Sequence, residues 1–194
     1  MKEKGSSLTT KEMVFGAILT ALVVILQLMG AFVRLGPFSV SLVLVPIVIG
    51  AAICSVKVGA WLGFVFGFVV LLLPGTSAFL SLSPVGTVIT VILKGALAGV
   101  AAAFIYKLLE ARNRYVASLV SAVVATFVNT GVFIIGSLIF FESDISIIIN
   151  VFVSLNFLIE LAVNTVLVPT IYRIINIKGS PLRTADKSVN EKEI

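Results

Sequence analysis

The chain has 194 residues, of which 59% are apolar and only 12% are charged, and its mean hydropathy is +1.20. A water-soluble domain of this size needs far more polar surface, so the composition indicates a membrane protein with several spans. The net charge is +5, histidine is absent, and the single cysteine, Cys54, excludes an internal disulfide and a cysteine-based metal site.

Hydrophobic segments follow one another along the chain, and we expect each of them to form a transmembrane helix. The six segments are Glu12–Met29, Val40–Cys54, Lys57–Leu73, Gly86–Lys107, Val116–Phe141 and Ile147–Ile175. A span needs about 20 residues, so the second segment is short and is expected to tilt or break at Pro46. The predicted fold is an all-α membrane protein, a six-transmembrane-helix bundle over residues 1–178, followed by a flexible cytoplasmic tail over residues 179–194.

The distribution of basic residues predicts the orientation of this bundle. All of the fourteen lysines and arginines except Arg34 and Lys94 lie at or beyond the segment ends on one side: near the first residues of the chain, around the second and fourth connections, and at or after the end of the sixth segment. The opposite side holds Arg34 and the acidic residues Glu142 and Asp144. Short loops rich in lysine and arginine stay in the cytoplasm, so both termini are predicted to be cytoplasmic.

Lys94 lies inside the fourth segment, about 10 Å below its outer end at 1.5 Å per residue. An ionised lysine at the centre of a span costs about 2.5–3.5 kcal/mol, so its side chain should face the bundle interior or water. In the sixth segment, Asn156, Glu160 and Asn164 are spaced to share one helical face, and Asn129 adds an amide in the fifth.

Two interpretations of these polar residues stay open. One is a structural ion pair between Lys94 and Glu160, with asparagine hydrogen bonds that join the helices. The other, which we favour, is a polar cavity in the outer half of the bundle, because the amides exceed what helix association needs.

Small residues four positions apart occur in the first segment at Ala17 and Ala21, with Gly16 beside them. This spacing lets another helix approach closely. Taken alone it is weak evidence for an external docking face, since Gly63/Gly67 and Gly95/Gly99 have the same spacing and such pairs usually serve internal packing.

The connection Leu73–Gly86 is long for a link between spans, is uncharged, and contains Pro74, Gly75, Pro84 and Gly86 as hinges. We expect it to close as a lid over the outer mouth of the bundle, with Phe79 and Leu80 as the capping side chains.

The sequence contains no sign of catalysis. It has no glycine-rich loop with a lysine and serine for nucleotide hydrolysis, no paired carboxylates and no serine–histidine pair. We therefore expect no catalytic residue, no metal, no cofactor and no nucleic-acid partner, and we do not expect an enzyme.

The combination of features resembles a known family. The six segments, the predicted cytoplasmic termini, the Ala17/Ala21 pair, "LKGALAG" in the fourth segment and "RLGPFSVSLVLVPIVIGA" (Arg34–Ala51) are similar to the substrate-binding S component of an energy-coupling-factor (ECF) vitamin transporter. The resemblance covers roughly Leu8 to Lys178. It implies that residues 1–178 are the substrate-binding domain of a multi-pass protein in the cell membrane of a prokaryote.

The resemblance also implies partners. Besides membrane lipid, these are a transmembrane coupling subunit that would contact Ala17 and Ala21, two cytoplasmic ATPase subunits that energise import, and a vitamin captured from outside. Lys94, Asn129, Asn156, Glu160 and Asn164 are the expected substrate-binding residues.

The stretch from Gly36 to Ala51 looks most like the pantothenate-type subgroup, whose carboxylate would suit Lys94, while riboflavin, folate and a pyridoxine-like ring stay open. Thiamine-type members of the family rely on several tryptophans near the outer face. Thiamine is therefore disfavoured, because the only tryptophan here, Trp61, falls near the cytoplasmic start of the third segment. Two rival functions also stay open: a structural or assembly membrane protein without a ligand, and a stand-alone carrier driven by protons through Glu160.

Overall fold

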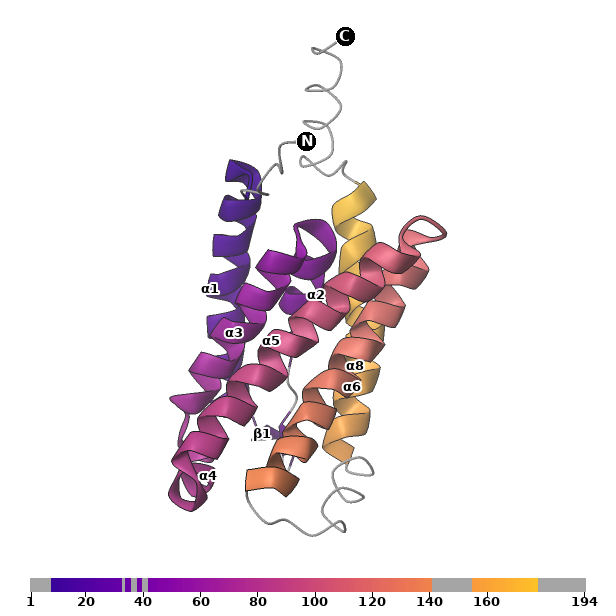
Figure 1. The fold of residues 1–194 in the computed structure, drawn as a ribbon. Helices are drawn as coiled ribbons and strands as arrows, with labels where there is room; N and C mark the ends of the chain where they lie inside the picture. The colour runs from indigo at the N-terminus through magenta and orange to yellow at the C-terminus, as the bar shows by residue number, and fades with distance from the viewer. Residues whose placement is uncertain (1–7, 33, 36–37, 40–41, 141–154, 178–194) are drawn as a thin grey trace, which may run out of the picture.

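The fold is an all-helical bundle with one short hairpin, described by a computed structural model over residues 8–32, 34–35, 38–39, 42–140 and 155–177 (Figure 1). The elements in chain order are α1 (Thr10–Phe32), β1 (Arg34–Leu35), β2 (Phe38–Ser39), α2 (Leu44–Ile53), α3 (Val56–Leu71), the 3-10 turn η1 (Pro74–Thr76), α4 (Ser77–Leu82), α5 (Pro84–Leu109), α6 (Arg114–Phe140) and α8 (Leu155–Ile177). The predicted tail, residues 179–194, lies outside the described residues.

Local sequence fixes where several helices begin. Thr9 and Glu12 form a capping box at the start of α1, in which each side chain bonds the backbone N–H of the other residue. The side chain of Ser55 caps α3. Ser83 accepts a hydrogen bond from the backbone of Gly86, and Pro84 follows as the first residue of α5, where its missing N–H costs nothing.

The helices pack around α5, which lies between α3 and α6. Helix α8 packs on α6, and α1 lies on the outer side of α3. At one end of the bundle α1, α3 and α6 begin and α5 and α8 end (Figure 1, top). At the other end, here called the α4 end, α3 leads into α4, α5 begins and α6 ends.

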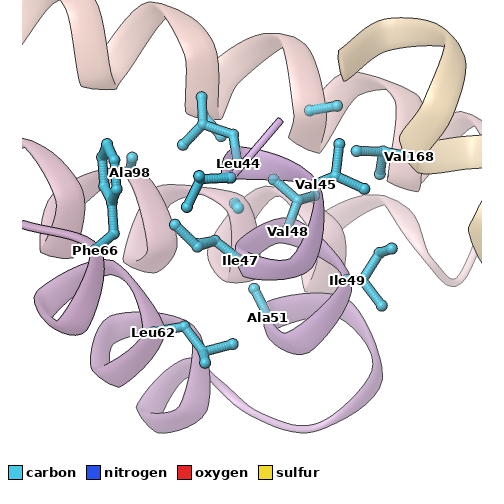
Figure 2. Close-up of a cluster of buried hydrophobic side chains, with 14 of the residues drawn as sticks. Leu44, Val45, Ile47, Val48, Ile49, Ala51, Leu62, Phe66, Ala98 and Val168 are labelled. Carbon is cyan, nitrogen blue, oxygen red and sulfur yellow. The ribbon is translucent and has the colours of Figure 1, made fainter. Parts of the chain in front are cut away.

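Helix α2 forms the centre of the hydrophobic core. All of its residues from Leu44 to Ala51 are buried. They pack against α3, α5 and α8, as Figure 2 shows for Leu62, Phe66, Ala98 and Val168. The helix is shorter than the predicted segment Val40–Cys54, and Pro46 does not break it. Pro46 instead lies in the first turn, where the helix has no backbone bond to lose.

Glycines allow α3 and α5 to touch backbone to backbone. A Cβ atom on Gly63 would overlap the carbonyl of Gly95, and one on Gly59 would lie 2.8 Å from the carbonyl oxygen of Gly99. On Gly67 it would lie 2.7 Å from the carbonyl oxygen of Val91. We call these five glycines the glycine seam. Both predicted glycine pairs therefore serve internal packing.

Among the described residues, three helices are long and apolar enough to cross a membrane by length and composition: α1 over Thr10–Gly30, α5 and α6. A fourth span results if α3 and the segment Pro74–Leu82, which are bent by 78° relative to each other, count as one. Helix α2 is a shorter apolar helix. The count of six spans stays a prediction.

Apart from Arg34 and Lys94, the basic residues of the described chain lie at the end of the bundle opposite α4. Lys11 and Lys57 are in the first turns of α1 and α3, Lys107 is in the last turn of α5, and Arg114 begins α6. These helix ends lie together in Figure 1. The cytoplasmic orientation of this end remains a prediction from the positive-inside rule.

The connection Leu73–Gly86 is more ordered than the sequence suggested. It forms η1, the short helix α4 and the first turn of α5. Thr76 ties the turn to the end of α3, because its hydroxyl donates to the backbone carbonyl of Val70 at 2.7 Å. The segment is therefore folded and lies beside the end of α3 and the start of α5 (Figure 1).

Candidate functional site

Lys94 is half-buried within α5, about 15 Å along the helix from Pro84 at 1.5 Å per residue. Its ammonium lies 5.5 Å from the centre of the Phe66 ring on α3 and 5.1 Å from that of Phe133 on α6. Within the described residues it makes these two contacts and no hydrogen bond. Such cation–π contacts are worth about 0.5–2 kcal/mol each, so the rings hold the charge in place without using its three hydrogen-bond donors.

The glycine seam is what brings Phe66 to Lys94. A Cβ atom on Gly95, the residue after Lys94, would lie 3.0 Å from the Phe66 ring. Side chains larger than hydrogen at the seam would separate α3 from α5 and move this ring away from the ammonium.

Glu160 on α8 is close enough to Lys94 for the two side chains to interact electrostatically. Its Oε1 atom is buried and has no hydrogen-bond partner in the described part of the chain. The predicted ion pair is therefore not closed through this oxygen, and both groups keep bonding capacity.

Asn164 lies four residues after Glu160 on the same face of α8 and is 0% exposed. Its Nδ2 donates to Oγ1 of Thr126 on α6 at 3.2 Å, and this hydrogen bond joins the two helices. The Asn164 amide therefore contributes to helix association, as expected from the interpretation in which asparagine hydrogen bonds join the helices. Its Oδ1 atom, however, is buried without a partner among the described residues.

Asn129 is 8% exposed on α6, and its Oδ1 also lacks a partner among the described residues. It follows Thr126 by one turn, while Glu160 precedes Asn164 by one turn on a helix that runs the opposite way (Figure 1). Asn129 and Glu160 therefore both lie one turn nearer the α4 end than the Thr126–Asn164 bond. Asn156 is in the first turn of α8, but its side chain lies outside the described residues.

The capping segment reaches this site through an aromatic contact. Phe79 on α4 packs edge-on against Phe133, with the ring centres 5.7 Å apart and the planes at 82°. Phe133 in turn lies over Lys94. Leu80, the other predicted capping residue, is half-buried. A direct path of contacts thus runs from α4 to the ammonium.

Three residues of the site were not predicted: Phe66, Phe133 and Thr126. Thr126 and Phe133 lie one turn to either side of Asn129, so helical spacing could have found them. Phe66 carries no such signal, because its place beside Lys94 depends on how closely α3 and α5 approach.

The face of α1 that carries Ala17 and Ala21 is exposed, whereas Gly16 is buried against Val58 of α3. The exposed face also carries larger apolar side chains: Met13, Val14, Ile18, Leu22 and Ile25. Unlike the glycine pairs of α3 and α5, the alanine pair on α1 therefore does not pack against another helix of the described bundle. This is the arrangement that an external docking face needs, although lipid contacts would leave the same residues exposed.

In a comparison with protein families, the family described as "ECF transporter, substrate-specific component" matches residues 11–172. The matched range contains α1 except its first residue, the glycine seam, and the polar residues Lys94, Asn129, Asn156, Glu160 and Asn164. Comparisons with curated proteins and with solved structures give no match.

Proposed function

Because the chain belongs to the family of ECF transporter substrate-specific components, we propose that it captures a vitamin from outside the cell with polar side chains of α5, α6 and α8. Membership makes it a multi-pass membrane protein and the substrate-binding component of a transporter, not an enzyme. It also implies association with a coupling module. The solute, the binding residues and the docking residues are our proposal.

The observation that carries the proposal is the unused bonding capacity around Lys94. Inserting the charge costs about 2.5–3.5 kcal/mol, and a purely structural lysine would recover this with hydrogen bonds to its neighbours. Lys94 contacts two aromatic rings instead, while Glu160 and Asn129 nearby keep buried oxygens without partners. Buried polar atoms without partners are rare and costly, so a bound solute is a direct reason for them.

Pantothenate is our leading candidate for this solute. Its carboxylate would bond Lys94, and its hydroxyls and amide would bond Asn129, Asn156 and Asn164. Riboflavin, folate and pyridoxine also carry groups that these side chains can bond, so they are the alternatives.

Equilibrium binding of each of the four compounds to the purified chain tests the proposal. We expect pantothenate to bind most tightly. Tighter binding of another compound would refute pantothenate alone, and a purified chain that binds no vitamin at all would refute the proposed capture function.

We further propose that α4 acts as the lid over the bound solute. Phe79 packs on Phe133, so movement of α4 would reach the ring that lies over Lys94. Opening is expected to uncover the site, and closure to retain the solute. Backbone hydrogen exchange in residues 74–82 should slow when the solute binds. Equal exchange with and without solute would contradict a lid.

For energisation, we propose that the exposed Ala17/Ala21 face of α1 docks the transmembrane coupling subunit, which two cytoplasmic ATPase subunits would drive. Small side chains at this spacing permit close helix contact, and neither alanine is buried in the bundle.

A further inference from the structure

The buried oxygens without partners in this bundle are all hydrogen-bond acceptors or hydroxyls, and the described residues offer them no donor. They belong to α5, α6 and α8: Thr90 Oγ1, Ser121 Oγ, Asn129 Oδ1, Glu160 Oε1 and Asn164 Oδ1. A hydroxyl can rotate to donate a hydrogen bond, and the oxygen and nitrogen of an amide can exchange places. Only the carboxylate and an amide of fixed orientation therefore show which atoms must act as acceptors.

The orientation of Asn164 is fixed by its neighbour. The hydroxyl of Thr126 donates its single proton to the backbone carbonyl of Ala122 at 3.0 Å. Its oxygen can then only accept, so it is the Nδ2 group of Asn164 that must face it, at 3.2 Å. The Oδ1 atom is consequently held on the other side of the amide as an acceptor, in a residue that is 0% exposed.

Glu160 places a second acceptor one turn away on the same helix face, since Oε1 is buried and has no partner among the described residues. On α5, Lys94 presents the opposite chemistry: an ammonium with three donors and no acceptor. The site is therefore polarised, with acceptors on α8 and a cationic donor on α5.

From this polarity, and resting on the proposed capture function, we infer that the substrate is a molecule with two unlike ends. Hydroxyl, amide N–H or ammonium donors face Glu160 and Asn164 on α8, and an anionic or carbonyl acceptor faces Lys94 on α5. A carboxylic acid whose remainder is apolar would satisfy Lys94 but leave the α8 oxygens unpaired. A bare metal cation would satisfy the oxygens but would be repelled by the Lys94 charge, with which Glu160 interacts.

The test compares probes with and without donors on the purified full-length chain in detergent. The donor-bearing probes are pantothenate, riboflavin, folate and pyridoxine, and the probe without a donor is lipoate, a carboxylate on an apolar ring and chain. We expect one of the first four to bind and lipoate not to bind. Glu160→Gln and, independently, Asn164→Leu should each weaken that binding by about tenfold or more, the effect of one hydrogen bond to a charged or fixed group.

Glu110→Gln is the matched control for the loss of a carboxylate, because Glu110 is exposed directly after the last residue of α5, at the end of the bundle away from α4. It should leave the dissociation constant unchanged. Preferred binding of lipoate would overturn the inference while capture itself stands. The inference would also be overturned if Glu160→Gln and Asn164→Leu left the affinity for the bound probe unchanged while Lys94→Met abolished it. If the purified chain binds no vitamin at all, the proposed capture function fails, and this inference fails with it.

Discussion

Replacing Lys94 by methionine separates a binding role of this residue from a structural one, because the two roles change stability and affinity in opposite ways. Methionine keeps the length and the apolar stem but removes the charge. The variant avoids an insertion cost of about 2.5–3.5 kcal/mol. It loses two cation–π contacts, to Phe66 and Phe133, of about 0.5–2 kcal/mol each.

Methionine sulfur also packs favourably on aromatic rings, by about 0.3–1.5 kcal/mol for each contact. These terms nearly cancel or favour the variant, while the lost electrostatic interaction with Glu160 acts against it. Lys94→Met should therefore unfold at a temperature close to that of the unmodified chain. Solute affinity should fall, because a hydrogen bond to a charged group contributes about 1.5–3 kcal/mol, or roughly ten- to hundredfold in the dissociation constant.

Thermal unfolding of the solute-free protein and equilibrium binding, measured on the same preparations, check both expectations. Lys107→Met is a suitable control, because this lysine lies in the last turn of the same helix and is exposed. The reasoning would be refuted by a Lys94→Met protein that unfolds at a clearly lower temperature but binds solute with unchanged affinity. Lys94 would then be a structural link between helices.

Three further expectations follow from the packing and the charge pattern. Ala21→Trp should abolish uptake and association with the coupling subunit but leave solute binding to the isolated chain nearly unchanged; lost binding would mean that the residue packs inside the bundle. Gly63→Val should instead lower the unfolding temperature, since added volume in a tightly packed interior costs about 1–3 kcal/mol or more, and unchanged stability would contradict the glycine seam. In a Cys54→Ser background, a cysteine placed between residues 179 and 187 should react with an impermeant thiol reagent only from the cytoplasmic side, and labelling from outside would overturn the predicted orientation.

Much of the bundle could be predicted because membrane helices carry strong local signals. Apolar length located α1, α5 and α6, but Pro84, which was expected to be a hinge of the connection, is the first residue of α5. The structure of the connection between α3 and α5 was not predicted, because η1 and α4 are too short to show a helical period. Their order depends partly on contacts with neighbouring helices, such as that of Phe79 with Phe133.

The candidate site was predictable only in its polar part. A charged or amide side chain in an apolar segment stands out, so Lys94, Asn129, Glu160 and Asn164 could be found. The different roles of these residues could not be predicted, because the orientation of the Asn164 amide is set by a hydrogen bond to Thr126, a residue 38 positions away. Nor could spacing distinguish an exposed alanine pair on α1 from glycine pairs that are buried between α3 and α5.

The most direct test of the central claim, capture of a polar solute at Lys94 and Glu160, is to identify what the protein carries when it is purified. The unmodified chain and the Lys94→Met/Glu160→Gln double variant would be isolated from cells grown in medium with vitamins, and the released small molecules identified and quantified by mass spectrometry. We predict that the unmodified chain carries one polar vitamin in near-stoichiometric amount and that the double variant carries almost none. Equal amounts in both proteins, or no solute in the unmodified chain, would contradict the account.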